Sequence, residues 1–202
     1  MLLKIYDDNP SRLKPVIDCL KNGGVIIYPT DTVYAIGCDI NNKQAIDRVS
    51  MIKGVKTEKA DYSFIFHDLS HLSEYTKQVD TATFKMLKKN LPGPFTFILN
   101  ANNSIPKLFK NKKKTVGIRI PDNRITRAIV EQFGNPIIST SVYDEDEVIE
   151  YTTDPDLIFE KYQDLVDLVI DGGMGKNEAS TVVDLTSGQT DIIRQGAGEL
   201  EF

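Results

Sequence analysis

Short hydroxyl-bearing side chains follow two apolar stretches of the chain. The two groups are Thr30-Asp31-Thr32, after the run that ends at Tyr28, and Ser139-Thr140-Ser141, after Ile137-Ile138. In open α/β sheets, ligands bind beyond the carboxyl ends of strands, so these side chains are suitably placed to hold a phosphate, a carboxylate or another small polar ligand. The same residue types are favoured in turns and helix caps. Position alone leaves both interpretations open.

Cationic side chains supply further candidates. Lys53 precedes a glycine at the end of a predicted helix, where it can either bond the last carbonyls or present its charge, together with Lys56, to an anion. Arg194 can offer a guanidinium fork, and Ser180-Thr181 hydroxyls, to the phosphates of a nucleotide. His67 at a strand end is either a proton shuttle or an ordinary histidine. The glycines match neither the phosphate-binding P-loop nor the dinucleotide fingerprint.

A run of lysines precedes the segment that begins at Val116. Lys112, Lys113 and Lys114 can contact RNA phosphates, or they can belong to a solvated loop, because no aromatic residues alternate with them to stack on bases. Eight Lys or Arg stand against one acid between residues 107 and 127, whereas the whole chain has a net charge of -5. This balance excludes a globally basic RNA-coating protein and leaves a local anion-binding face.

These candidates need a sheet that positions them. Short apolar runs bounded by turn residues predict strands, and stretches with helical spacing lie between several of them. The predicted strands are 25–28, 64–66, 95–99, 116–120, 137–138, 168–170, 182–183 and 192–193, and the predicted helices are 13–20, 45–52, 84–91 and 125–133. Asn123 and Asp154 are expected to cap helices, with Gly134 beyond a helix end. This alternation predicts an α/β fold, and the closely spaced last two strands predict a mixed sheet.

The length and composition of the chain indicate its domain organisation, location and metal content. A chain of 202 residues that is 41% hydrophobic can bury one core, so a single domain spanning residues 1–202 is expected. No apolar run of membrane-spanning length and no signal peptide stand out, so we expect no membrane partner and a cytoplasmic location. Two cysteines without metal-ligand spacing predict no protein-bound metal site.

Several motifs occur in a characteristic order along nearly the whole chain. They are Tyr-Pro-Thr-Asp-Thr-Val-Tyr-Ala-Ile-Gly at 28–37, Lys53-Gly54, Leu-Pro-Gly-Pro-Phe-Thr at 91–96, Val-Gly-Ile-Arg-Ile-Pro at 116–121, Ser139-Thr140-Ser141, and Ser-Thr-Val-Val-Asp-Leu at 180–185 with Arg194. This set resembles the YrdC family. The resemblance implies a twisted open sheet with a concave basic cleft. It also implies synthesis of L-threonylcarbamoyladenylate, a nucleotidyl transfer, from threonine, bicarbonate and ATP for the t6A modification of tRNA. Some members are described as binding double-stranded RNA.

The resemblance also implies roles for individual residues. Lys53, with Lys56 as a displaced second cation, is expected to act in catalysis. The residues expected to hold the substrate are Thr30, Thr32, Tyr34, His67 and Arg119. Those expected to face ATP or AMP are Ser139, Thr140, Ser141, Ser180, Thr181 and Arg194. Because the carbamate has only to be positioned against the α-phosphate, orientation, positive charge and the Mg²⁺ that accompanies ATP are expected to dominate.

The chain departs from the synthase pattern within the proposed cleft. Val55 replaces the arginine of a Lys-x-Arg motif, Asp61-Tyr62-Ser63 replaces Lys-Pro-Leu, Tyr143 replaces an asparagine and Ala35 replaces a glycine. Neither lysine nor tyrosine reproduces the lost donors. These changes resemble the YciO subgroup. We therefore expect ATP or adenylate binding with weak or altered synthase activity. The alternative is a protein that binds double-stranded RNA or tRNA without catalysis.

Overall fold

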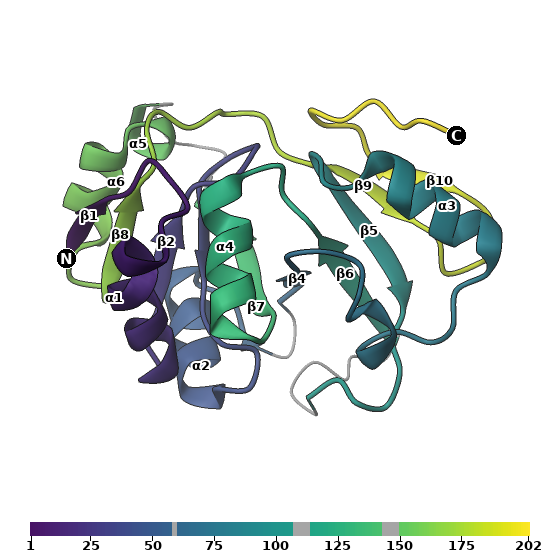
Figure 1. Ribbon diagram of the computed structural model, residues 1–202, viewed down its shortest axis with the longest axis horizontal. Helices are drawn as coiled ribbons and strands as arrows, with labels where there is room; N and C mark the ends of the chain where they lie inside the picture. Colours follow the sequence, from purple (N-terminus) through teal and green to yellow (C-terminus); the bar gives the residue numbers. More distant parts are fainter. Residues whose placement is uncertain (58–59, 107–113, 143–149) are drawn as a thin grey trace.

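A single ten-stranded sheet organises the chain (Figure 1). The computed structural model describes all residues except 58–59, 107–113 and 143–149. The strand order is β1-β8-β2-β3-β7-β4-β6-β5-β9-β10. The strands are β1 Leu2–Lys4, β2 Ile26–Tyr28, β3 Ala35–Gly37, β4 Ser63–Ile65, β5 Phe95–Asn100, β6 Thr115–Arg119, β7 Ile137–Ser141, β8 Leu168–Asp171, β9 Thr181–Asp184 and β10 Asp191–Arg194.

Parallel and antiparallel pairs both occur, so the predicted mixed sheet is confirmed. β2 pairs with β8 in parallel, whereas β9 and β10 form the expected antiparallel hairpin. The helices are α1 Pro10–Lys21, α2 Lys43–Ile52, η2 Leu72–Glu74, α3 Thr81–Asn90, α4 Arg124–Phe133, α5 Glu150–Thr153 and α6 Pro155–Tyr162. Their predicted caps are present: the Asn123 side chain accepts the Thr126 amide, Asp154 caps α6, and Gly134 has a φ of 82°.

The structure corrects the sequence prediction at three strands. β1 and β3 were not expected, because each has three residues and β3 reads Ala-Ile-Gly, which is too short and too small a pattern to register as a strand. β7 continues through Ser139-Thr140-Ser141, which were expected to follow its end. The hydroxyls can lie inside a strand here because β3 and β4 flank β7 and satisfy its backbone.

Apolar side chains cover both faces of the left half of the sheet. α1 and α4 lie in front of the strands in Figure 1 and pack on a cluster that includes Ile26, Ile137 and Leu168. α2 lies behind and packs on the neighbouring, oppositely pointing side chains, among them Ile27 and Ile138. The two helical layers therefore fix the orientation of β2, β3 and β7.

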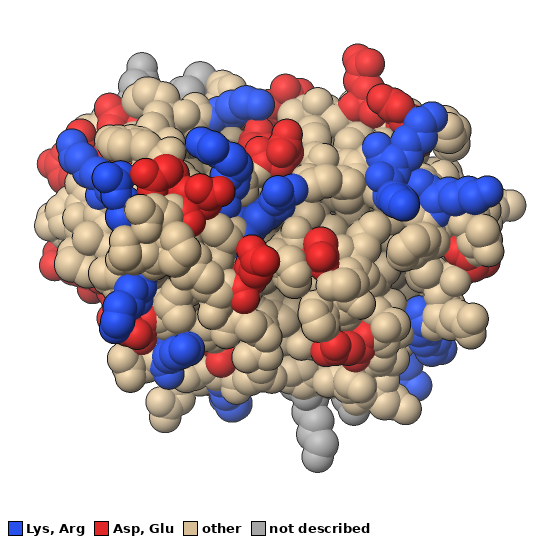
Figure 2. All heavy atoms as spheres, viewed as in Figure 1, with Lys and Arg blue, Asp and Glu red and all other residues tan. Residues whose placement is uncertain are grey.

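The visible surface carries charges of both signs (Figure 2). Lys and Arg gather most clearly over α3, while Asp and Glu intersperse with them elsewhere. The expected concave basic cleft therefore stays a prediction. No helix in the described part of the chain combines the length and apolarity needed to cross a membrane.

Candidate functional site

Small polar side chains line one face of the central strands. Ser63 of β4 pairs with Gly117 of β6 on one side and with Ser139 of β7 on the other. Cross-strand partners point to the same face of a sheet, so these three residues adjoin one another. A Cβ placed on Gly117 would lie 3.1 Å from Ser63 Oγ and 3.3 Å from Thr96 Cγ2, which brings Thr96 of β5 into the group.

The row continues to the edge of the sheet. Thr96 Oγ1 and Ser180 Oγ lie 2.8 Å apart, and both residues are buried. The guanidinium of Arg194 donates to the Ser180 carbonyl from Nε at 3.2 Å and from Nη2 at 2.8 Å. We call the set Ser63, Thr96, Gly117, Ser139 and Ser180 the polar floor.

A buried arginine stands beside this floor. Arg119 ends β6, and its Nη2 donates to Thr32 Oγ1 at 2.9 Å and lies 3.3 Å from Asp31 Oδ1. The side chains of Arg119 and Asp31 are each only 8% exposed. Burial lowers the pKa of Arg119, and the Asp31 carboxylate opposes that shift. Arg119 Nε is buried and has no hydrogen-bond partner among the described residues, so the guanidinium keeps one donor unused in this structure.

The segment between β2 and β3 forms a wall over Arg119. Thr30 Oγ1 donates to the Val33 carbonyl at 2.6 Å and accepts the Thr32 amide at 3.0 Å, which is a local turn. Thr32 is the member of this segment that reaches Arg119. Tyr34 holds the wall in place, because its hydroxyl donates to the Gly173 carbonyl at 2.7 Å and accepts the Gly172 amide at 3.1 Å.

Two predicted nucleotide ligands point away from the floor. Thr140 pairs with Ile36 and therefore shares the opposite face of the sheet. Thr181 also lies on that face, and its Oγ1 donates to the Gly198 carbonyl at 2.7 Å while accepting the amides of Gly196 and Gly198. Thr181 is thus a structural hydroxyl. Ser141 pairs with Ala35 and shares the face of Ser139.

The predicted catalytic lysines lie at the end of α2. Lys53 is the C-cap of that helix, and Lys56 is exposed after it. The buried residues of α2 pack behind the sheet, on the face opposite the polar floor. Contact of either lysine with a ligand therefore stays a prediction. Lys112, Lys113 and Tyr143 fall outside the described residues, and Lys114 directly precedes β6.

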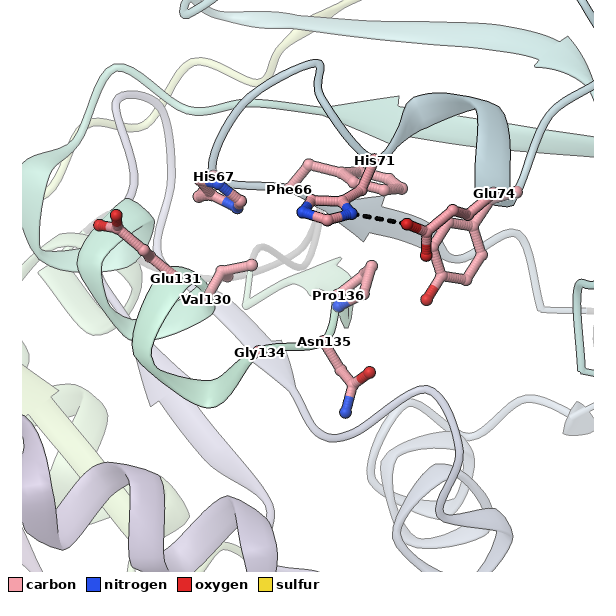
Figure 3. A pocket seen from close by; sticks show the side chains of 10 residues that line it. Phe66, His67, His71, Glu74, Val130, Glu131, Gly134, Asn135 and Pro136 are labelled. Carbon is pink, nitrogen blue, oxygen red and sulfur yellow. Dashed lines mark hydrogen bonds and ion pairs between the residues drawn. The ribbon is translucent and has the colours of Figure 1, made fainter.

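His67 belongs to a different hollow (Figure 3). This hollow has a volume of about 110 Å³ and lies between the end of β4, η2 and the last turn of α4. His71 Nδ1 and Glu74 Oε1 lie 2.6 Å apart on one side of it, and Glu131 lies on the other. His67 is the one predicted site residue in its lining. Along the backbone His67 is close to Arg119, because the Phe66 amide donates to the Arg119 carbonyl at 2.9 Å, but contact of the His67 side chain with a substrate stays a prediction.

Some residues of the polar floor were not predicted as site residues. Thr96 alternates with buried Phe95 and Phe97, and a polar residue at that period marks a polar face. Gly117 lies inside a strand, where a glycine often marks the close approach of a ligand or of another backbone segment. Ser63 stood out as a departure from the synthase pattern, yet it occupies the centre of the floor. These were the available signals.

The described residues do not assemble a metal-binding cluster of three or more His, Cys, Asp or Glu side chains. Asp31 is the acid that pairs with Arg119 beside the floor, and its oxygens already meet Arg119 and the Asp122 amide. Mg²⁺ that accompanies a nucleotide takes most of its ligands from phosphates and water. These residues therefore fit an ion that arrives with its substrate.

Known proteins share this architecture. The Sua5/YciO/YrdC family model, described as "Telomere recombination", matches residues 18–196. The chain is 37% identical to the "Uncharacterized protein YciO" of Escherichia coli K12 over 98% of this chain and 96% of that protein. The crystal structure of E. coli YciO superposes with a TM-score of 0.90, covering 100% of this chain and 98% of that one.

More distant relatives carry functional names. A threonylcarbamoyl-AMP synthase of Coxiella burnetii is 26% identical over 88% of this chain and 94% of that protein. The crystal structure of P. abyssi Sua5 complexed with L-threonine has a TM-score of 0.86 at 21% identity, over 97% of this chain and 57% of that chain, which shows the shared fold. From the family model and the close likeness to YciO, the chain belongs to the Sua5/YciO/YrdC family.

Proposed function

We propose that the protein binds ATP and L-threonine along the polar floor and forms threonylcarbamoyl-adenylate with weak or altered efficiency. The observation that carries the proposal is Arg119, a buried cation whose Nε has no partner among the described residues and which stands at the end of a row of hydroxyls that leads to Arg194. An acidic small molecule at Arg119 and a phosphate chain along the hydroxyls match this arrangement.

In this proposal the two ends of the site bind different ligands. Arg119 and Thr32 would hold the threonine carboxylate, since a buried guanidinium binds a carboxylate strongly and directionally. The hydroxyls of Ser139 and Ser180 would orient the nucleotide without adding charge. The threonine nitrogen and bicarbonate would form a carbamate with loss of water. An oxygen of this carbamate would then attack the α-phosphorus of ATP as pyrophosphate leaves. The protein has chiefly to align the reacting atoms.

The altered positions predict reduced efficiency. Val55 is 44% exposed and supplies no charge where related synthases carry arginine. Loss of one positioned cation at a phosphoryl transfer weakens stabilisation of the transition state. The relatives named for the synthase activity or complexed with threonine support the reaction class, and the departures in the site support a lower rate.

Incubation of the purified protein with L-threonine, bicarbonate and Mg-ATP tests the reaction. We expect pyrophosphate and an equal amount of threonylcarbamoyl-adenylate, both dependent on threonine. The double variant Arg119→Met/Asp31→Asn is the inactive control, because it does not leave Asp31 buried without its charge partner. Release of neither product, at protein concentrations where ATP binds, would overturn the synthase proposal. RNA binding remains the competing prediction, and of its lysines only Lys114 is described.

A further inference from the structure

A glycine-rich loop after β8 packs on the wall over Arg119. It runs from Gly172 to Lys176 and was not among the motifs that we assigned to the site. The Lys176 amide donates to the Thr32 carbonyl at 3.2 Å, and the Gly175 amide donates to the Thr153 carbonyl at 2.7 Å. The loop is therefore attached directly to the residue that contacts Arg119.

Three glycines make this close packing possible. A Cβ on Gly172 would lie 2.6 Å from the Pro29 ring, and a Cβ on Gly175 would lie 2.7 Å from the Tyr34 ring. Gly173 has a φ of +93°, a conformation that side-chain-bearing residues rarely adopt. A side chain on Gly172 or Gly175 would collide with the wall, and one on Gly173 would strain the backbone. The chain thus holds the backbone of Lys176 at a defined position over the site.

Lys176 is a cation at the outer side of this site. Its residue is exposed, and it forms no ion pair with another described residue. The nearby Asp171 carboxylate is already used, since it accepts the Tyr6 hydroxyl at 2.8 Å and the Gly173 amide at 2.9 Å. Arg119 is buried, whereas Lys176 is exposed and its amide is bonded to Thr32.

We propose that Lys176 binds the β- and γ-phosphates of the nucleotide and so supplies a cation that Val55 cannot. This inference rests on the proposed function and adds a residue to the same site. A compact carboxylate can enter the buried end at Arg119, but the phosphate chain of ATP must extend toward solvent. A flexible lysine near the mouth suits that chain as a mobile point charge. The contact gives ATP, and not AMP, an additional charge-assisted hydrogen bond.

Calorimetry with Mg-ATP, AMP and inorganic triphosphate tests the assignment. We expect Lys176→Gln to weaken ATP and triphosphate binding roughly tenfold and AMP binding less than about twofold, because one charged contact is lost. Lys176→Arg retains the charge and should keep most of the affinity. Lys21→Gln, at the exposed end of α1, is the matched control and should leave the affinity for all three ligands unchanged.

A second variant moves the loop and leaves the lysine in place. Gly175→Ala should weaken ATP more than AMP, since the added methyl group collides with Tyr34. Equal ATP affinity in wild type and Lys176→Gln would overturn the assignment of Lys176 while the proposed function stood. Absence of both ATP and triphosphate binding in the wild-type protein would overturn both.

Discussion

One face of the sheet has two halves with opposite chemistry. Under α1 and α4, buried residues such as Ile26, Ile137 and Leu168 form an apolar cluster. On β4, β6 and β5 the same face presents Ser63, Gly117 and Thr96 instead. Both halves are largely buried, so burial alone does not distinguish core from site. In the apolar half the side chains pack against one another. In the polar half they carry hydrogen-bonding groups that a ligand can use.

The two halves contribute to stability in different ways. The apolar half contributes stability through area removed from water, at about 25 cal/mol per Å². The polar half gains little in that way, and Arg119 there retains a buried nitrogen without a described partner. Such a group lowers stability unless something binds it. The two halves should therefore respond differently to substitution.

The largest effect is expected at Arg119. Arg119→Met should abolish threonine binding and lower the free energy of unfolding by about 3–5 kcal/mol, because Asp31 stays buried without its charge partner. Urea unfolding and calorimetry measure the two quantities. The double variant Arg119→Met/Asp31→Asn should regain part of the stability and none of the binding. A double variant no more stable than the single one would contradict this charge pairing.

Truncation in the apolar half should affect stability alone. Ile26 is fully buried, so Ile26→Ala should lower the free energy of unfolding by about 2–5 kcal/mol through lost packing and a cavity. The affinity of the folded fraction for ATP should stay within about twofold, since no ligand contact is removed. Calorimetry well below the unfolding temperature checks this. A tenfold loss of affinity would mean that the two halves are not independent.

Substitutions at two neighbouring hydroxyl residues should distinguish effects on nucleotide binding from effects on stability. Ser180→Ala should weaken nucleotide binding roughly three- to tenfold and cost about 1 kcal/mol of stability, because one hydroxyl is lost from the floor. Thr181→Val should leave binding unchanged and cost about 1–3 kcal/mol, because the amides of Gly196 and Gly198 lose their acceptor. Matching effects in both variants would contradict the division of faces.

The smallest effect is expected outside both halves, at His71. Its hydrogen bond to Glu74 raises the pKa of His71 above the ordinary 6.5. The pair therefore stabilises the fold fully below the unfolded-state pKa, and this contribution disappears as pH rises through the folded-state pKa. Melting temperature should fall slightly over that interval, and Glu74→Gln should remove the trend. An unchanged trend in that variant would assign it to other groups.

The sequence predicted most long elements but only part of the site. The helical spacing of apolar residues and the two cap residues predicted α4 between Asn123 and Gly134, because the local sequence of an amphipathic helix marks both its buried face and its ends. β3 was missed, since Ala35–Gly37 is defined by its neighbours in the sheet. Motif order predicted roles for Arg119, Ser180 and Thr181 alike, and it could not show that Ser180 and Thr181 face opposite sides of the sheet. Their opposite directions follow from the register of β9 beside β5, which no local pattern contains.

An NMR titration of the ¹⁵N-labelled protein with Mg-ATP and L-threonine tests the division of the sheet most directly. We predict that the amide signals of Gly117 and Ser180 move on ligand addition and that those of Ile26 and Leu168 stay in place. Arg119→Met should remove the shifts that depend on threonine. Shifts confined to the residues around His71, or equal shifts in both halves of the face, would contradict the assignment of the polar floor as the ligand site.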